Sequence, residues 1–244
     1  MPYVKLMFTP HQPIEDEDSA VDSLWDYLSC LYKNGQILES YEIVKSAGSF
    51  LAFATLPESD SLDEKHNNIY VSKYVESVKQ LFIITVENIG ENLDTMNSCL
   101  CEEGPLWYML YSDWTDEESP VVCGNCGRSV PLYKLPHILM EDEHHGVLGW
   151  KQAYRDVDGL YIYCLSDRFT YRQMHDVNSR LSKDGRDICK AFEDATGIPF
   201  YYYLFHHKKT PVTCPVCGKG WKLTGDKTFI DYKCEKCRLV ADEA

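Results

Sequence analysis

The chain has 244 residues and a hydrophobic content of 44%, enough for one large domain or two smaller ones with a real core. Its formal net charge is −14, which argues against a protein that holds nucleic acid over a large surface. The N-terminus lacks a basic segment followed by an apolar one, and no apolar run approaches the roughly 20 residues that span a bilayer. We therefore expect a cytoplasmic protein with no membrane segment.

The negative charge is concentrated in the first half of the chain. Residues 1–119 contain 6 Lys/Arg and 22 Asp/Glu, a balance of −16. Residues 120–205 contain 10 and 11, and residues 206–244 contain 8 and 5, which gives −1 and +3. A strongly anionic region repels phosphate backbones and attracts basic proteins. The alternative interpretation is that the acidity only keeps the protein soluble.

The first 90 residues predict the element order strand, helix, strand, strand, helix, strand. Apolar periodicity and turn residues place strands over 3–9, 41–44, 50–54 and 81–86 and helices over 20–34 and 68–80. We expect Ser19 as the N-cap of the first helix, Gly35 just past its end, and a hairpin turn at Ala47-Gly48. This order predicts a ferredoxin-like βαββαβ unit in an α+β protein.

The middle of the chain predicts a mixed α/β region. The pattern indicates strands over 106–111, 160–164 and 200–205, a helix around 149–155, and helical residues over 170–195 that break near 182–185. Gly197 and Pro199 end the last helix. The strand over 200–205 has aromatic residues on both faces, as in a covered central strand, although aromatic stacking on unpaired bases is an alternative. The pairs His144-His145 and His206-His207 are expected on the surface.

Two C-x-x-C pairs near the C-terminus predict a zinc ribbon. Cys214, Cys217, Cys234 and Cys237 form two tight pairs with 16 residues between them, which is the spacing that a tetrahedral Zn²⁺ needs. All four ligands are thiolates, so no coordination position remains for water or substrate, and the zinc is structural. Short β-prone runs at 221–224 and 228–232 flank the pairs. Because no flexible linker precedes it, the ribbon is expected to pack on the rest of the chain.

A third C-x-x-C supports three interpretations. Twenty-one residues separate Cys99 and Cys101 from Cys123 and Cys126, so the four could bind a second zinc ion. They could instead be buried small apolar residues. A redox pair is the third interpretation, but that motif usually opens a helix, whereas the glycines around Cys126 favour a turn.

No short catalytic motif is present, and we expect no enzymatic activity. The chain contains no P-loop, nucleophile elbow, zinc-protease helix or dinucleotide fingerprint. Two acidic runs are instead candidate contacts for a basic partner. The alternative interpretation is that each run is only a solvated loop. Their residues are Glu15, Asp16, Glu17 and Asp18, and Asp113, Asp116, Glu117 and Glu118.

The C-terminal half resembles a known bacterial family. Residues 185–189 (GRDIC), 192–204 and 233–240 carry the resemblance, which extends weakly to 120–123 and 130–133. The family is described as zinc-ribbon-containing proteins of unknown function, with a suggested role in nucleic-acid binding. Similar proteins are associated with loci for Rhs-type polymorphic toxins, and the resemblance thus implies an immunity protein.

These observations predict three parts and one leading function. The parts are an acidic, ferredoxin-like domain over 1–119, an α/β region with a C-x-x-C knuckle over 120–205, and a zinc ribbon over 206–244. We expect a non-enzymatic zinc protein that neutralises a basic protein partner, such as a toxin domain. The alternative is nucleic-acid binding through the basic residues of the ribbon, which are Lys208, Lys209, Lys219, Lys222, Lys233, Lys236 and Arg238.

Overall fold

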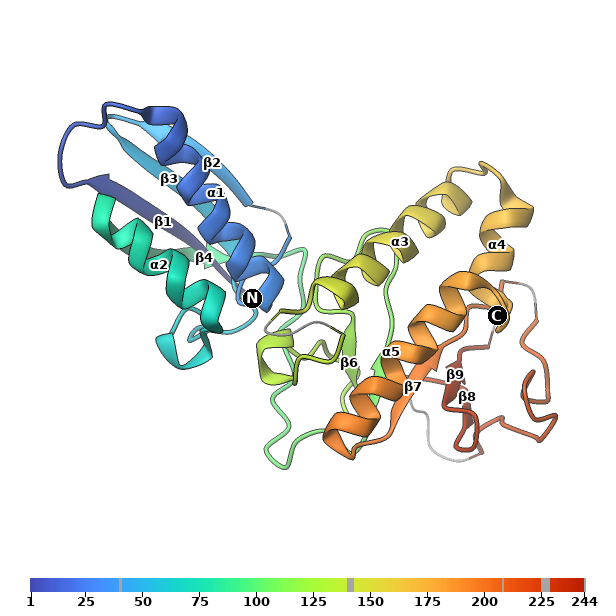
Figure 1. The fold of residues 1–244 in the computed structure, drawn as a ribbon. Helices are drawn as coiled ribbons and strands as arrows, with labels where there is room; N and C mark the ends of the chain where they lie inside the picture. The colour runs from blue at the N-terminus through green and yellow to red at the C-terminus, as the bar shows by residue number, and fades with distance from the viewer. Residues whose placement is uncertain (40, 140–142, 208, 225–228, 244) are drawn as a thin grey trace. The chain divides into compact units, whose positions relative to one another are not determined.

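The structure is a computed structural model that describes residues 1–39, 41–139, 143–207, 209–224 and 229–243 (Figure 1). Its contacts divide the chain into two compact units. The first unit contains residues 1–98, 117–119 and 129–145, and the second contains residues 99–116, 120–128 and 146–244. The predicted boundaries at 119 and 205 stay predictions. None of the described helices combines the length and apolar character needed to cross a bilayer.

The first unit is an antiparallel four-stranded sheet with two helices. In chain order its main elements are β1 (Pro2–Pro10), α1 (Glu17–Asn34), β2 (Tyr41–Ser46), β3 (Ser49–Thr55), α2 (Ile69–Leu81) and β4 (Phe82–Glu91). The strand order is β2-β3-β1-β4, and both helices cover the same face of the sheet (Figure 1). This is the ferredoxin-like arrangement that the element order predicts.

Alternation along β1 produces the core of this unit. Val4, Leu6 and Phe8 are buried, and the residues between them are half-exposed, as expected for a strand covered on one face. They pack against the apolar stripes of α1 and α2, including Leu28 and Val78. Burial of such side chains contributes roughly 1.5–3 kcal/mol each.

The caps of α1 show one wrong prediction and one correct one. The N-cap is Asp16, not Ser19, because the Asp16 carboxylate accepts a hydrogen bond from the Ser19 backbone N–H at 3.1 Å. Gly35 ends the helix with φ +81°, as predicted. The β2–β3 hairpin turns at Ala47 and Gly48, which both have positive φ.

Residues 129–145 belong to the first unit although they lie far along the sequence. A Cβ at Gly35 would lie 2.6 Å from the Cβ of Leu132, in the short helix η2 (Leu132–Lys134). The Tyr133 hydroxyl donates to Glu58 at 2.8 Å, and Lys134 forms an ion pair with the same carboxylate. A second short helix, η1 (Glu64–His66), lies before α2.

The second unit is a mixed five-stranded sheet with three helices. Its elements are β5 (Tyr108–Leu110), β6 (Val121–Cys123), α3 (His145–Ile162), α4 (Asp167–His175), α5 (Arg180–Thr196), β7 (Phe200–Tyr203), β8 (Tyr232–Cys234) and β9 (Leu239–Ala241). The strand order is β6-β5-β7-β9-β8. β7 is central and parallel to both neighbours, which confirms the covered-strand interpretation. The C-terminal strands share this sheet, and the expectation that they pack on the rest of the chain is confirmed.

Three local predictions for residues 144–196 are wrong. Residues 160–162 continue α3 rather than forming a strand. The buried stripe of the helix ends at Asp158, and Leu160 and Ile162 are exposed, so this apolar run has no covered sheet face to occupy. The break between α4 and α5 falls at 176–179, because Ser179 caps α5 through the Ser182 backbone N–H. His144 is buried rather than exposed, and burial lowers its pKa to about 3.

Candidate metal centres

The C-terminal cysteines converge on one point. The Sγ atoms of Cys214, Cys217, Cys234 and Cys237 all lie within 4.8 Å of one another. Zn–S bonds of about 2.3 Å in a tetrahedron require sulfur–sulfur separations of about 3.8 Å. The Cys217 and Cys234 sulfurs are 3.7 Å apart. The four thiols therefore fit a tetrahedral metal ion.

The first knuckle positions its thiols through backbone hydrogen bonds. The Cys214 N–H donates to the Lys219 carbonyl at 2.7 Å, and the Gly218 N–H donates to the Cys214 carbonyl at 2.9 Å. Gly218 has φ +70°, a conformation that favours glycine. A hydrogen bond from the Lys219 backbone lowers the pKa of the Cys217 thiol to about 7. This favours the thiolate, which is the form that binds metal.

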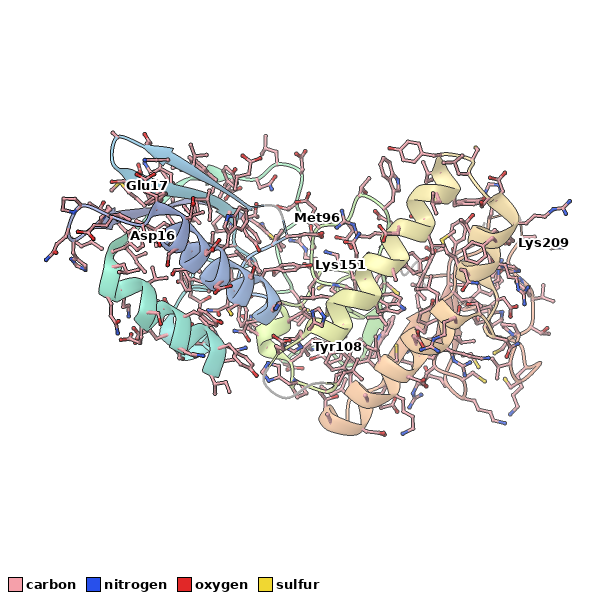
Figure 2. The ribbon with its side chains drawn as sticks, turned by 45° about the horizontal axis from the view of Figure 1, so that its top comes forward. Asp16, Glu17, Met96, Tyr108, Lys151 and Lys209 are labelled. Carbon is pink, nitrogen blue, oxygen red and sulfur yellow. The ribbon has the colours of Figure 1, made fainter. Side chains whose placement is uncertain are left out.

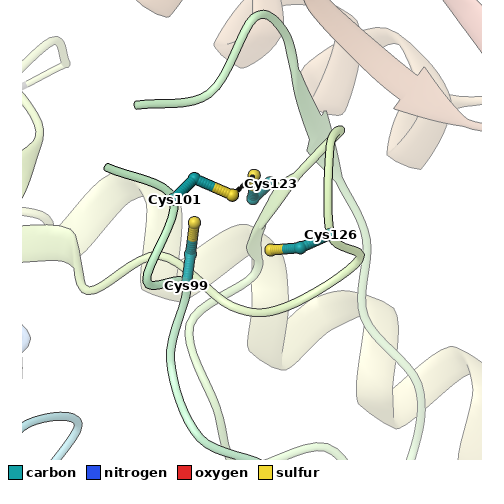
Figure 3. A group of neighbouring side chains, drawn as sticks. All are labelled: Cys99, Cys101, Cys123 and Cys126. Atoms are coloured by element: carbon teal, nitrogen blue, oxygen red, sulfur yellow. Dashed lines mark hydrogen bonds between the residues drawn. The ribbon is translucent and has the colours of Figure 1, made fainter. Parts of the chain in front are cut away.

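The upstream cysteines form a second group of the same kind (Figure 3). The Sγ atoms of Cys99, Cys101, Cys123 and Cys126 also lie within 4.8 Å of one another, and those of Cys101 and Cys123 are 3.9 Å apart. Cys123 ends β6, and Cys126 follows in the turn after it. This separation is close to the value for a tetrahedral zinc site and much longer than a disulfide bond.

The turns after Cys123 and Cys214 have the same hydrogen-bond pattern. The Cys123 N–H donates to the Arg128 carbonyl at 2.8 Å, and the Gly127 N–H donates to the Cys123 carbonyl at 2.8 Å. Gly127 has φ +70°, as Gly218 does. Both turns therefore read C-x-x-C-G, with the glycine in the left-handed position that closes the knuckle. The C-x-x-C-G sequence that both segments share thus indicates the turn structure that they share.

The redox interpretation of Cys123 and Cys126 fits this geometry poorly. A redox C-x-x-C usually begins a helix and has a thiol of lowered pKa. Cys126 is followed by a turn, not a helix. Hydrogen bonds lower the pKa of the Cys126 thiol, whereas burial raises the pKa of Cys123 to about 11, so it is the turn and not the pKa that argues against a redox pair. A metal ion would remove the Cys123 proton by coordination. Four converging thiols thus favour a metal site.

An aromatic layer connects the segments of the chain that carry the two cysteine groups. Trp107 stacks on Phe229 at 5.9 Å and meets Tyr201 edge-on at 5.2 Å. The Lys233 Nζ lies 4.3 Å from the Trp107 ring centre and 4.5 Å from that of Tyr201. A Cβ on Gly124 would lie 2.0 Å from Trp107. The layer thus joins the knuckle of Cys123 to β8, which carries Cys234.

The first acidic run lies at the N-terminal end of α1 (Figure 2). Glu15, Asp16, Glu17 and Asp18 are all exposed. Asp16 caps the helix, and Glu17 forms an ion pair with Lys45 at 2.6 Å. The structure therefore brings all four carboxylates to one exposed helix end, where two of them also stabilise the fold.

The second acidic run is half-buried and takes part in local structure. The Asp113 carboxylate accepts hydrogen bonds from the Thr115 backbone and hydroxyl at 2.8 and 2.6 Å. Glu118 accepts from the Met96 N–H at 2.7 Å. Asp116 and Glu117 are also half-buried and hold interactions of their own. These carboxylates are less available to a partner than those of the first run.

Several basic residues of the alternative nucleic-acid face are engaged within the unit. Lys222 pairs with Glu243 at 2.6 Å, and Lys233 pairs with Glu235 at 3.0 Å. Arg238 pairs with Glu193 at 2.8 Å. Lys209, Lys219 and Lys236 are exposed, and Lys208 lies outside the described residues.

Two relatives decide the family of this chain. A protein of Haemophilus influenzae described as uncharacterized is 28% identical over 245 residues, which cover 92% of this chain and 88% of that protein. A second uncharacterized protein of the same organism is 30% identical over 151 residues, which cover 57% of this chain and 71% of that protein. The chain belongs to their family. The resemblance predicted a family of unknown function, and this prediction is confirmed.

Family models match three consecutive segments of the chain. A domain of unknown function, DUF2310, matches residues 102–205. Two further domains of unknown function, DUF8589 and DUF8594, match residues 2–89 and 206–244. The DUF2310 segment contains Cys123 and Cys126, and the DUF8594 segment contains the four C-terminal cysteines.

Solved structures are similar to a smaller part of the chain. One is SnoaB, a cofactor-independent oxygenase from Streptomyces nogalater, with a TM-score of 0.30 and 9% identity over 38% of this chain and 98% of that chain. Another is an antibiotic biosynthesis monooxygenase, with a TM-score of 0.28 and 15% identity over 38% of this chain and 99% of that chain.

Proposed function

We propose that this chain is a zinc protein with two structural sites that binds a basic protein partner in the cytoplasm. The two sites are the groups of Cys99, Cys101, Cys123 and Cys126 and of Cys214, Cys217, Cys234 and Cys237. Zinc is the metal that four thiolates in a tetrahedron favour, and such a site leaves no position for substrate. The proposed role is therefore that of a zinc ribbon and a second knuckle that stabilise a binding protein, without catalysis.

Metal analysis tests the first half of this proposal. The chain purified without added metal is expected to contain two zinc ions. One zinc ion per chain would exclude the site of Cys99, and the absence of zinc would exclude both. Because metal binding and folding form one equilibrium in such modules, removal of zinc by a chelator should also lower the melting temperature.

The proposal of a basic protein partner rests on one observation, the unneutralised charge of residues 1–119. This segment has 22 carboxylates and only 6 basic side chains, so internal pairing leaves most of its charge uncompensated. Of the two acidic runs, the exposed helix end at Glu15–Asp18 is the better contact, because the other run is half-buried. An acidic surface accelerates association with a basic target and disfavours wrong partners.

The narrower form of the proposal is an immunity protein that neutralises a toxin domain. The direct test is co-expression with the product of the neighbouring upstream gene, where the chain should restore growth. Unchanged toxicity in its presence would refute the immunity role. Binding of the two purified proteins, measured at low and high salt, would still test the more general role.

A double variant tests the proposed contact without disturbing the fold. Glu15→Gln with Asp18→Asn removes two charges but keeps the Asp16 cap and the Glu17–Lys45 pair. Glu91→Gln with Asp94→Asn is the matched control, since these exposed residues lie elsewhere in the unit and change the net charge equally. We expect slower association only for the first variant. Equal effects would mean that net charge acts without a localised contact.

A further inference from the structure

A cavity of about 580 Å³ lies between α5 and the C-terminal cysteine knuckles. One wall is a face of α5, where Lys183, Arg186 and Lys190 recur at helical spacing. The other wall contains Val216, which lies between Cys214 and Cys217, and Lys236, which lies between Cys234 and Cys237. The volume is within the range of about 300–1,000 Å³ that is typical of small-molecule sites.

Five basic side chains line this cavity, but only three lack an acidic partner. Lys190 forms an ion pair with Asp194, and Arg238 forms one with Glu193. The other three, Lys183, Arg186 and Lys236, form no ion pair with any residue that the structure describes. One further carboxylate, that of Asp187, lines the same cavity. A surplus of positive charge therefore remains at these three side chains, although Cys237, a ligand of the proposed zinc site with its net charge of about −2, also lines the cavity.

The chemistry of the three free cations favours a phosphate group. A guanidinium offers parallel N–H donors that match two oxygens of a phosphate, and lysines add charge without strict geometry. The three cations can together pair with the oxygens of a dianionic phosphate. The Cys189 thiol at its floor is no candidate nucleophile, because burial raises its pKa well above the ordinary value.

The charge of the whole unit argues for a small ligand rather than a nucleic acid. By sequence, residues 99–116, 120–128 and 146–244 contain 17 Lys/Arg and 17 Asp/Glu. These side chains sum to zero, and two four-thiolate zinc sites of about −2 each would make the unit negative. Such a unit gives a polyanion no long-range attraction, whereas a local cluster of cations still binds one phosphate.

We infer that this cavity binds a small phosphorylated molecule, with its phosphate on Arg186, Lys183 and Lys236. The inference does not depend on a basic protein partner. Its test is calorimetric titration of the full chain with inorganic phosphate, with a nucleoside 5′-monophosphate and with an oligonucleotide that lacks terminal phosphates. We expect saturable binding of one phosphate or monophosphate per chain and no tighter binding of the oligonucleotide.

Two variants on the same helix locate the site. Arg186→Gln should weaken phosphate binding by about tenfold, the effect of one lost charge-assisted contact pair. Arg180→Gln is the matched control, because Arg180 is on α5 but does not line the cavity, and it pairs with Asp184. If Arg186→Gln unfolds the unit, Lys183→Gln replaces it, since Lys183 is exposed, and should weaken binding severalfold.

Three results would overturn the inference. The first is no saturable binding of either phosphate probe by the unaltered chain. The second is an equal loss of affinity in the Arg180→Gln control and in the cavity variant. The third is tighter binding of the oligonucleotide with a steep salt dependence, which would assign the cations to a nucleic-acid backbone.

Discussion

Gly185 lies inside α5, where replacing glycine by alanine normally stabilises a helix by about 1 kcal/mol. The structure predicts the opposite sign. A Cβ at this position would lie 2.3 Å from the Tyr202 ring and 2.8 Å from the Trp150 indole nitrogen. Tyr202 is completely buried in the central strand, and the Trp150 N–H is held by the Leu181 carbonyl at 3.1 Å. Neither ring can move without disturbing the core.

Overpacking of this kind costs about 1–3 kcal/mol. We expect the upper part of that range here, because two constrained rings are involved. After subtraction of the helix-propensity gain, Gly185→Ala should destabilise the second unit by about 1–2 kcal/mol.

Gly149→Ala is the matched control, since Gly149 is also helical but a Cβ there would meet no atom within 4 Å. It should stabilise the unit by up to about 1 kcal/mol. Urea unfolding followed by tryptophan fluorescence, at constant zinc content, measures both variants. A Gly185→Ala protein as stable as the control would refute the packing of α5 on β7 described above.

Three further predictions concern the thiols, the aromatic layer and a buried histidine. Cys126→Ser should reduce the zinc content from two ions to one. Cys164→Ser, which changes an exposed thiol outside both groups, should leave two zinc ions. Metal analysis of the two variants distinguishes these results. Lys233→Met should destabilise the second unit by about 1–2 kcal/mol, because its ammonium group contacts two ring faces; an unchanged urea midpoint would contradict this. The pKa of His144 is lowered by burial to about 3, so the stability that its neutral form gives is present above pH 6.5 and is lost as the pH falls toward 3. At pH 5 this loss is at most about 2 kcal/mol relative to pH 7, and in a His144→Phe variant that part of the pH dependence should disappear.

The sequence predicted the features that depend on local pattern. Apolar alternation in β1, helical periodicity in α1 and the C-x-x-C-G turns each follow from neighbouring residues. The order of elements in the first 90 residues was then sufficient for the topology of the first unit. The pairing of Cys99 and Cys101 with Cys123 and Cys126 was one of three open interpretations, because their approach depends on the fold between them.

The features that the sequence did not predict depend on contacts between distant segments. Residues 129–145 join the first unit through Tyr133 and Glu58, which are 75 positions apart. Lys233 reaches Trp107 only because β5 and β8 belong to one sheet. The end of α3 was misassigned because the β-propensity of 160–164 was taken to indicate a covered strand, whereas Leu160 and Ile162 are exposed. The cavity beside α5 likewise forms only because Lys236 and Cys237 lie close to that helix in the fold.

The parallel pairing of β7 with both β5 and β9 has a consequence for biogenesis. The strands of this sheet begin at Tyr108 and reach Ala241, and hydrogen bonds within it join segments separated by many tens of residues. A growing polypeptide cannot complete the sheet until Leu239 to Ala241 have been synthesised. Assembly of the second unit is thus a late event, and until then its aromatic middle strand must be kept from aggregating.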